Sequence, residues 1–194
     1  MNIEKSSVLN TLETTIGDHL DLAIQQFQNL PEHVLLYKPE SGAWSLAECL
    51  WHLNSYSEYY HPAIQKAMDT TKKGNSSSDL MKSSWLGRWF TSLMKPGKGK
   101  YSAFPGHRPP AKVLPAETVA AFIQHQEQLT ELIRKARQTD ISRIRIPISI
   151  NRFVSLPLAD VFEFVVTHNE RHIQQGLRAL PHDEKVNFRS TYTN

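Results

Sequence analysis

Three histidines have the residue type and spacing that could support chemistry in this chain. His168 and His172 lie four residues apart in the run VVTHNERHIQQ, which spans 165–175, and His52 lies far upstream. If this run is helical, residues four apart project from the same face, one above the other. Two such imidazoles and a third from another helix would give three nitrogen ligands for a metal ion. This arrangement leaves a position open for water or substrate.

The apolar pattern around the pair predicts that both imidazoles face the protein interior. At about 100° per residue, His168 and His172 straddle the stripe that Val161 and Val165 set. Buried imidazoles need partners for both ring nitrogens, which a purely apolar core does not offer. Gln175 shares their face, and we interpret it as a residue that orients a ligand or water. The alternatives are a polar core network for the histidines and a surface role for Gln175.

Other metal-binding patterns fit the sequence less well. A zincin helix needs Glu directly after its first His, whereas Glu170 is two residues after His168. Carboxylate-bridged di-iron bundles need a Glu-x-x-His pair on two helices, and the sequence has none. Glu48 fits an N-terminal capping box with Ser45, and Cys49 fits a small buried apolar residue. We expect structural or surface roles for the other histidines, which are His19, His33, His61, His107, His125 and His182.

Hydrophobic spacing predicts four long amphipathic helices. Their expected ranges are 6–29, 45–73, 115–138 and 157–180, the second starting at the capping box and ending in a basic turn before Gly74. About forty residues separate helices two and three, and we expect one short helix there, over 85–94. These elements predict an all-α fold: one four-helix-bundle domain over 1–194 with a long elaborated connection between helices two and three.

One segment is expected to lack regular structure, and a second gives only a weak strand signal. The stretch 95–110 is rich in Pro, Gly and Lys, which is typical of an irregular loop. A loop of this length in a compact domain is usually functional or mobile. The segment 144–148 alternates apolar and polar residues, but Pro147 argues against a strand because proline cannot donate to a ladder.

Positive charge is concentrated between helices two and three. The chain has a net charge of +3, but 72–112 contains nine Lys or Arg and one acid, a local net charge of +8, so the remainder carries −5. This asymmetry favours an anionic ligand or an acidic partner near the segment 79–112, which is also rich in Trp. A solvated loop-rich insertion is the alternative.

Several classes of protein are disfavoured. With one cysteine the chain cannot form an internal disulfide, and the first residues do not read as a secretory signal. No stretch of about 18 apolar residues predicts a membrane span, so a cytoplasmic location is the default expectation. No helix-turn-helix, zinc finger or stacking-aromatic motif predicts contact with nucleic acid.

The sequence resembles the DinB-like (DinB/YfiT) superfamily of metal-binding four-helix proteins. The resemblance covers most of the chain, from Leu35 to Leu180, and rests on the run GAWSLAECLWHL at 42–53 and on His168-x-x-Arg171-His172-x-x-Gln175. It implies that His52, His168 and His172 bind one divalent metal ion, with water completing the site. It also implies an up-up-down-down bundle with a long crossing and, often, a homodimer.

The resemblance leaves the reaction open. Relatives include S-transferases that use low-molecular-weight thiols, maleylpyruvate-isomerase-like enzymes and members without known activity. We expect a metal-dependent thiol transferase or hydrolase acting on a small molecule, with Zn or Ni as the ion and Fe, Co or Mn as further candidates. A non-catalytic stress-related binding module with a structural metal is the second hypothesis. Attachment of the amphipathic stretch 85–94 to a membrane surface is the third.

Overall fold

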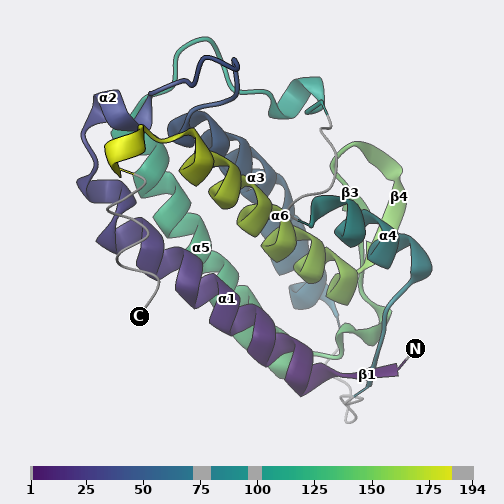
Figure 1. Ribbon diagram of the computed structural model, residues 1–194. Helices are drawn as coiled ribbons and strands as arrows, with labels where there is room; N and C mark the ends of the chain where they lie inside the picture. Colours follow the sequence, from purple (N-terminus) through teal and green to yellow (C-terminus); the bar gives the residue numbers. More distant parts are fainter. Residues whose placement is uncertain (1, 72–79, 96–101, 185–194) are drawn as a thin grey trace.

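Four long helices form the protein, as the computed structural model shows for residues 2–71, 80–95 and 102–184 (Figure 1). They are α1 (Lys5–Gln25), α3 (Leu46–Thr70), α5 (Pro115–Arg137) and α6 (Leu158–Ala179). Helices α5 and α6 both pack against α1 and against α3. The fold is therefore all-α and the four-helix bundle is confirmed.

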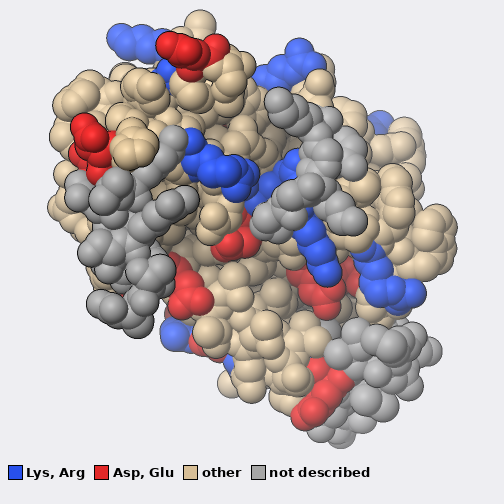
Figure 2. Space-filling model, in the orientation of Figure 1, with Lys and Arg blue, Asp and Glu red and all other residues tan. Residues whose placement is uncertain are grey.

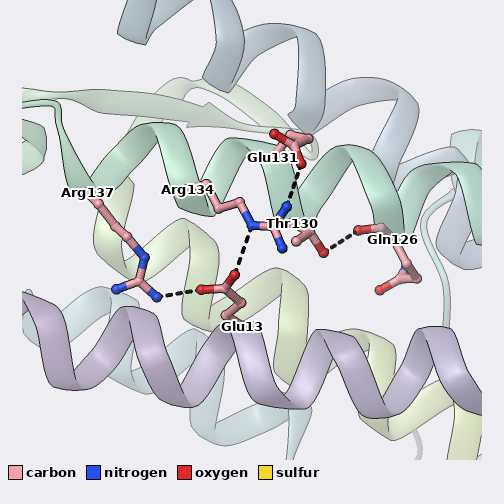
Figure 3. Close-up of polar contacts among 6 residues, drawn as sticks. All are labelled: Glu13, Gln126, Thr130, Glu131, Arg134 and Arg137. Atoms are coloured by element: carbon pink, nitrogen blue, oxygen red, sulfur yellow. Dashed lines mark hydrogen bonds and ion pairs between the residues drawn. The ribbon is translucent and has the colours of Figure 1, made fainter.

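The helices run up, down, down, up, and the expected up-up-down-down order was wrong (Figure 1). Glu13 in the first half of α1 pairs with Arg134 and Arg137 at the end of α5, so these two helices are antiparallel (Figure 3). Asp69 and Lys135 pair at the ends of α3 and α5, so those neighbours are parallel. Parallel neighbours need a connection that returns along the whole bundle, which explains the length of the 71–114 segment.

Local signals set most helix ends. Ser45 Oγ accepts from the Glu48 backbone N–H at 3.2 Å, and Glu48 Oε2 accepts from the Ser45 N–H at 2.9 Å, so the capping box is confirmed. Helix α1 stops at Gln25, and a 3-10 turn, η1 (Phe27–Asn29), completes the predicted range. Helix α3 ends at Thr70. The predicted basic last turn at 72–74 lies outside the described residues.

Shorter elements decorate the bundle. The predicted short helix is confirmed as α4 (Trp85–Met94), which packs against α6. Strands β1 (Asn2–Glu4) and β2 (Leu80–Lys82) pair antiparallel. The remaining short helices are α2 (Glu32–Leu35), η2 (Pro105–His107) and η3 (Ile141–Arg143). Turn η2 lies within the stretch that we expected to be irregular.

The alternating segment around Pro147 does form a strand, although we expected the proline to disfavour one. Strand β3 (Arg145–Ile148) pairs antiparallel with β4 (Asn151–Pro157), and Pro147 lies opposite Ser155 beside an irregularity in the register. In a two-stranded ribbon each strand is an edge, where a residue without an N–H is tolerated. The hairpin packs beside α4 and α6.

A buried polar layer divides the bundle core into two hydrophobic clusters. One cluster includes Ile16, Tyr60, Leu129 and Val165, and the other includes Leu22, Leu53, Phe122 and Ile173. Each long helix places a buried polar residue between the two clusters, namely His19, Asn54, Gln126 and Asn169. Asn169 Nδ2 donates to Gln126 Oε1 at 3.2 Å. The candidate site lies at this level of the bundle, where the apolar core is interrupted.

Candidate metal centre

The structure brings the three predicted histidines together. His52 comes from the second turn of α3, and His168 and His172 come from the second half of α6, which runs antiparallel to α3. Their candidate ligand nitrogens all lie within 4.8 Å of one another. His52 Nε2 and His168 Nε2 are 3.2 Å apart. His52 and His168 are buried, and His172 is half-buried.

A backbone carbonyl fixes the tautomer of His52. His52 Nδ1 lies 2.6 Å from the carbonyl oxygen of His107 in η2. Because a carbonyl can accept and not donate, Nδ1 carries the proton and donates it. In the neutral ring Nε2 then keeps its lone pair, and this nitrogen faces His168. Metal-binding histidines characteristically make such a hydrogen bond with the ring nitrogen that does not bind the ion.

Burial keeps all three imidazoles neutral at pH 7. Burial lowers the pKa of His52 to about 4, although the hydrogen bond to His107 opposes it. Burial, with smaller contributions from His52 and Arg171, lowers the pKa of His172 to about 3. The pKa of His168 lies well below its usual value, first because of burial and then because of the other two histidines. Neutral imidazole is the form that binds metal ions.

These residues fit a divalent metal ion. His52 Nε2 offers a lone pair toward His168 Nε2, and the buried Nδ1 of His172 has no hydrogen-bond partner. A buried polar atom without a partner is costly to the fold, and in native proteins it commonly marks a function or a bound ion. Three imidazole nitrogens without a carboxylate suit zinc and the neighbouring transition metals.

Aromatic rings and one amide surround the three histidines. The ring centroid of Trp44 lies 5.1 Å from that of His52 and 6.1 Å from that of His172. The ring centroid of Tyr56 lies 4.5 Å from that of His168. Gln175, predicted on the same face, forms a side-chain hydrogen bond that raises the pKa of His172 against the larger effect of burial.

His107 was expected to be a structural or surface residue, yet it forms part of this site. Its carbonyl binds His52, and its ring stacks on Tyr56 with centroids 3.8 Å apart. Ser55 Oγ also lies 2.9 Å from His107 Nδ1. Nothing in the spacing of the sequence links His107 to His52. The Pro and Gly around it, which form η2, were the one signal of a turn.

A pocket of about 1420 Å³ opens above the histidines. Its floor includes a stripe of α6, and its walls come from α4, the β3–β4 hairpin and the 39–44 loop. Among the described lining residues, most are apolar or aromatic, and the charged ones are all arginines: Arg108, Arg171 and Arg178. The site therefore combines three candidate metal-ligand nitrogens with a large apolar cavity, the usual setting of a small-molecule site.

Helix α6 holds both ends of α4 over this pocket. At the start of α4, Asp160 accepts from the Ser84 N–H at 2.9 Å and from its hydroxyl at 2.6 Å. A Cβ at Gly87 would lie 2.2 Å from the Asp160 carboxylate, so the close approach requires glycine. At the other end, Arg171 donates to the carbonyls of Leu93 and Lys95. The α4 wall is thus tied to the helix that carries two of the three histidines.

Three other side chains that could bind a metal ion have different roles. Glu48 closes the capping box and pairs with Lys38 at 2.6 Å. Glu170 points to His19, with 2.8 Å between Oε2 and Nε2. Cys49 is fully buried, and burial raises the pKa of its thiol. None of these groups belongs to the described lining of the pocket.

Comparison with known proteins identifies the family. The family model described as the DinB superfamily matches residues 18–175, a range that includes His52, His168 and His172. Neither a curated protein nor a solved structure gives a match. No helix in the described part of the chain is long and apolar enough to cross a membrane. The chain belongs to the DinB superfamily.

Proposed function

We propose that this protein is a metal-dependent enzyme of the thiol transferase or hydrolase type. In this proposal His52, His168 and His172 bind one divalent ion at the floor of the pocket. The observation that carries the proposal is the hydrogen bond from His52 Nδ1 to the His107 carbonyl. It directs the free electron pair of His52 Nε2 toward the other two histidines, beneath a cavity that can hold a substrate.

The donor set determines what a bound ion would contribute. An ion held by three neutral imidazoles keeps its full positive charge and lowers the pKa of a thiol or water that binds beside it. Zn and Ni suit this set best, and Fe, Co and Mn are further candidates. The protein contributes neutral ligands, a fixed tautomer at His52 and largely apolar pocket walls.

Among the described residues, Tyr56 is a candidate to hydrogen-bond a substrate near the histidines. It lines the pocket, and burial raises the pKa of its hydroxyl to about 12, so the hydroxyl stays protonated. A protonated hydroxyl can donate to an oxygen or sulfur atom of a bound molecule. The described lining includes no Asp, Glu, Lys or Cys, so none of the described lining residues offers a carboxylate or amine as a general base.

That lack of a base favours one alternative, a non-catalytic binding module in which the ion is structural. The two proposals differ in a measurable way. An enzyme should convert a substrate when the ion is present, whereas a module should bind the ion and small molecules without turnover. The alternative leaves the assignment of the three histidines unchanged.

A thiol-transfer and ester-hydrolysis screen tests the enzyme proposal. Metal-free protein would be reconstituted with Zn or Ni and assayed with cysteine or glutathione against a chloronitrobenzene electrophile, and separately with nitrophenyl esters. We expect turnover above background with added metal and none for His168→Ala. The matched control is His125→Ala, which removes a histidine outside the pocket and should retain turnover. Metal binding without turnover on any substrate would favour the binding module.

A further inference from the structure

We propose that the pocket binds an organic anion with an apolar body, whose carboxylate pairs with Arg178 while its other end approaches the three histidines. This inference deepens the proposed function by naming a substrate class, and it rests on that function for the role of the histidine end. It commits to a free small-molecule carboxylate as the ligand.

The charge of the pocket supports an anion. Three arginines and no carboxylate belong to the described lining, so the cavity is positive before any metal binds. Figure 2 shows basic side chains following the line of α6 and α4 across this face of the molecule. Arginine in a partly apolar site favours a carboxylate because its planar N–H groups can form two parallel hydrogen bonds to the two oxygens.

The three arginines differ in how far they are already engaged. Arg171 donates to backbone carbonyls of α4, and Arg108 Nε donates to the Ala103 carbonyl at 2.8 Å. Arg178 is exposed and forms no ion pair with any carboxylate in the described residues. Arg178 is therefore the guanidinium best able to take a new anionic partner.

The walls determine the rest of the ligand. Phe90 and Leu93 of α4, Ile148 and Ile150 of the hairpin, and Phe164 of α6 face the cavity. Contact with these side chains removes apolar surface from water, which contributes roughly 25 cal/mol for each Å² of that surface. A compact polar anion would leave these walls in contact with water, whereas an aliphatic or aromatic body would cover them.

The spacing along α6 sets the length of the ligand. Arg178 lies six residues beyond His172, and both line the pocket. At 1.5 Å per residue this corresponds to roughly 9 Å along the helix axis. A ligand with its carboxylate at Arg178 must cover about this distance to bring its other end to the histidines. A medium-chain acid such as decanoate is a suitable probe.

Binding of decanoate to the full chain tests the inference. Titration calorimetry would compare decanoate with decanol, which shares the apolar body without the charge, on metal-free and zinc-loaded protein. We expect decanoate to bind both forms, and Arg178→Gln to weaken it about tenfold or more, as for loss of a hydrogen bond to a charged group. Arg143→Gln removes an arginine outside the pocket and should bind like the wild type.

A second variant tests the apolar wall. Ile150 lies in the hairpin and is 36% exposed, so Ile150→Asn should fold. It should weaken the binding of decanoate and of decanol alike, whereas Arg178→Gln should leave decanol binding unchanged.

Equal decanoate affinity in the wild type and in Arg178→Gln would overturn the inference, as would decanoate binding that requires zinc. Decanoate binding without metal binding would overturn the proposed function alone, and metal binding without decanoate binding would overturn this inference alone.

Discussion

Helix α3 contributes a buried histidine to two different places, and the comparison shows what distinguishes a candidate metal site from an ordinary core histidine. His52 and His61 are 3% and 5% exposed. Burial is the largest cause that lowers the pKa of each, to about 4 in both. Neither burial nor a lowered pKa therefore identifies the candidate ligand.

The surroundings of the two rings differ. His52 donates to the His107 carbonyl and faces two further imidazoles beneath a pocket. His61 lies 3.4 Å from the Gln128 amide oxygen through Nδ1, and its ring centroid is 5.5 Å from that of His125. The buried Nε2 of His61 has no partner, and the pocket does not reach it. A third imidazole, a fixed tautomer and an open cavity separate the two sites.

The largest effect is expected on the pH dependence of folding stability, to which His61 contributes. Burial lowers its pKa from the usual imidazole value of about 6.5 to about 4, so between these pH values the unfolded chain takes up a proton that the folded chain does not. Stability should fall as pH decreases through this window, by roughly 3 kcal/mol from this residue. His61→Leu, measured by urea denaturation with chelator at pH 7 and pH 4, should lose that part of the slope. A slope equal to the wild type would mean that His61 is not buried as described.

Zinc should raise the free energy of unfolding through the site of His52, His168 and His172, and not through His61. At a free concentration 100 times its Kd, a ligand specific for the folded state raises the free energy of unfolding by about 2.7 kcal/mol. Scanning calorimetry should show this gain for the wild type and for His61→Leu, and no gain for His172→Ala. A zinc-dependent gain in His172→Ala that disappears in His61→Leu would reverse the assignment.

A smaller effect is expected at Gln175. Its side chain is hydrogen-bonded to His172. Loss of a group that orients a metal ligand typically weakens metal affinity by about 10- to 100-fold. Gln175→Ala should weaken zinc about tenfold in competition with a chromogenic chelator. Gln128→Ala, which removes the amide beside His61, is the matched control and should keep wild-type zinc affinity.

The smallest effect on zinc affinity is expected for replacement of His107. Replacement by Ala keeps the carbonyl that binds His52 and removes the ring that stacks on Tyr56. Such an aromatic pair contributes about 0.5–1.5 kcal/mol, so zinc affinity should fall only a few-fold as η2 loosens. A loss as large as that of His172→Ala in the same chelator competition would instead make the His107 ring itself a participant in the site.

Local sequence signals predicted the helices well. The apolar stripe of α5 places both of its ends within one residue, and the capping box of α3 places its start within one residue, because such signals act within single turns. The short helix over 85–94 also follows from its own spacing. The convergence of His52 with His168 and His172 agrees with the resemblance to the family, whereas metal binding itself stays a prediction.

Features that depend on distant parts of the chain were not predicted. The direction of each helix depends on packing such as the α3–α5 pairing, which no local pattern contains. The β3–β4 hairpin tolerates Pro147 because its ribbon has two free edges, a property of topology rather than of spacing. The hydrogen bond from His52 to His107 joins residues 55 positions apart. Its acceptor is a backbone carbonyl, a group that every residue has, so the residue types do not reveal it.

Metal content shows directly whether the three histidines bind an ion. Untagged protein would be exposed to zinc or nickel, desalted and measured by mass spectrometry beside His168→Ala and His125→Ala. The three-histidine site predicts one equivalent of metal in the wild type and in His125→Ala, and none in His168→Ala. Wild-type protein without metal, or a His168→Ala variant that retains it, would rule out the three-histidine metal site and leave the histidines as a polar network within the core.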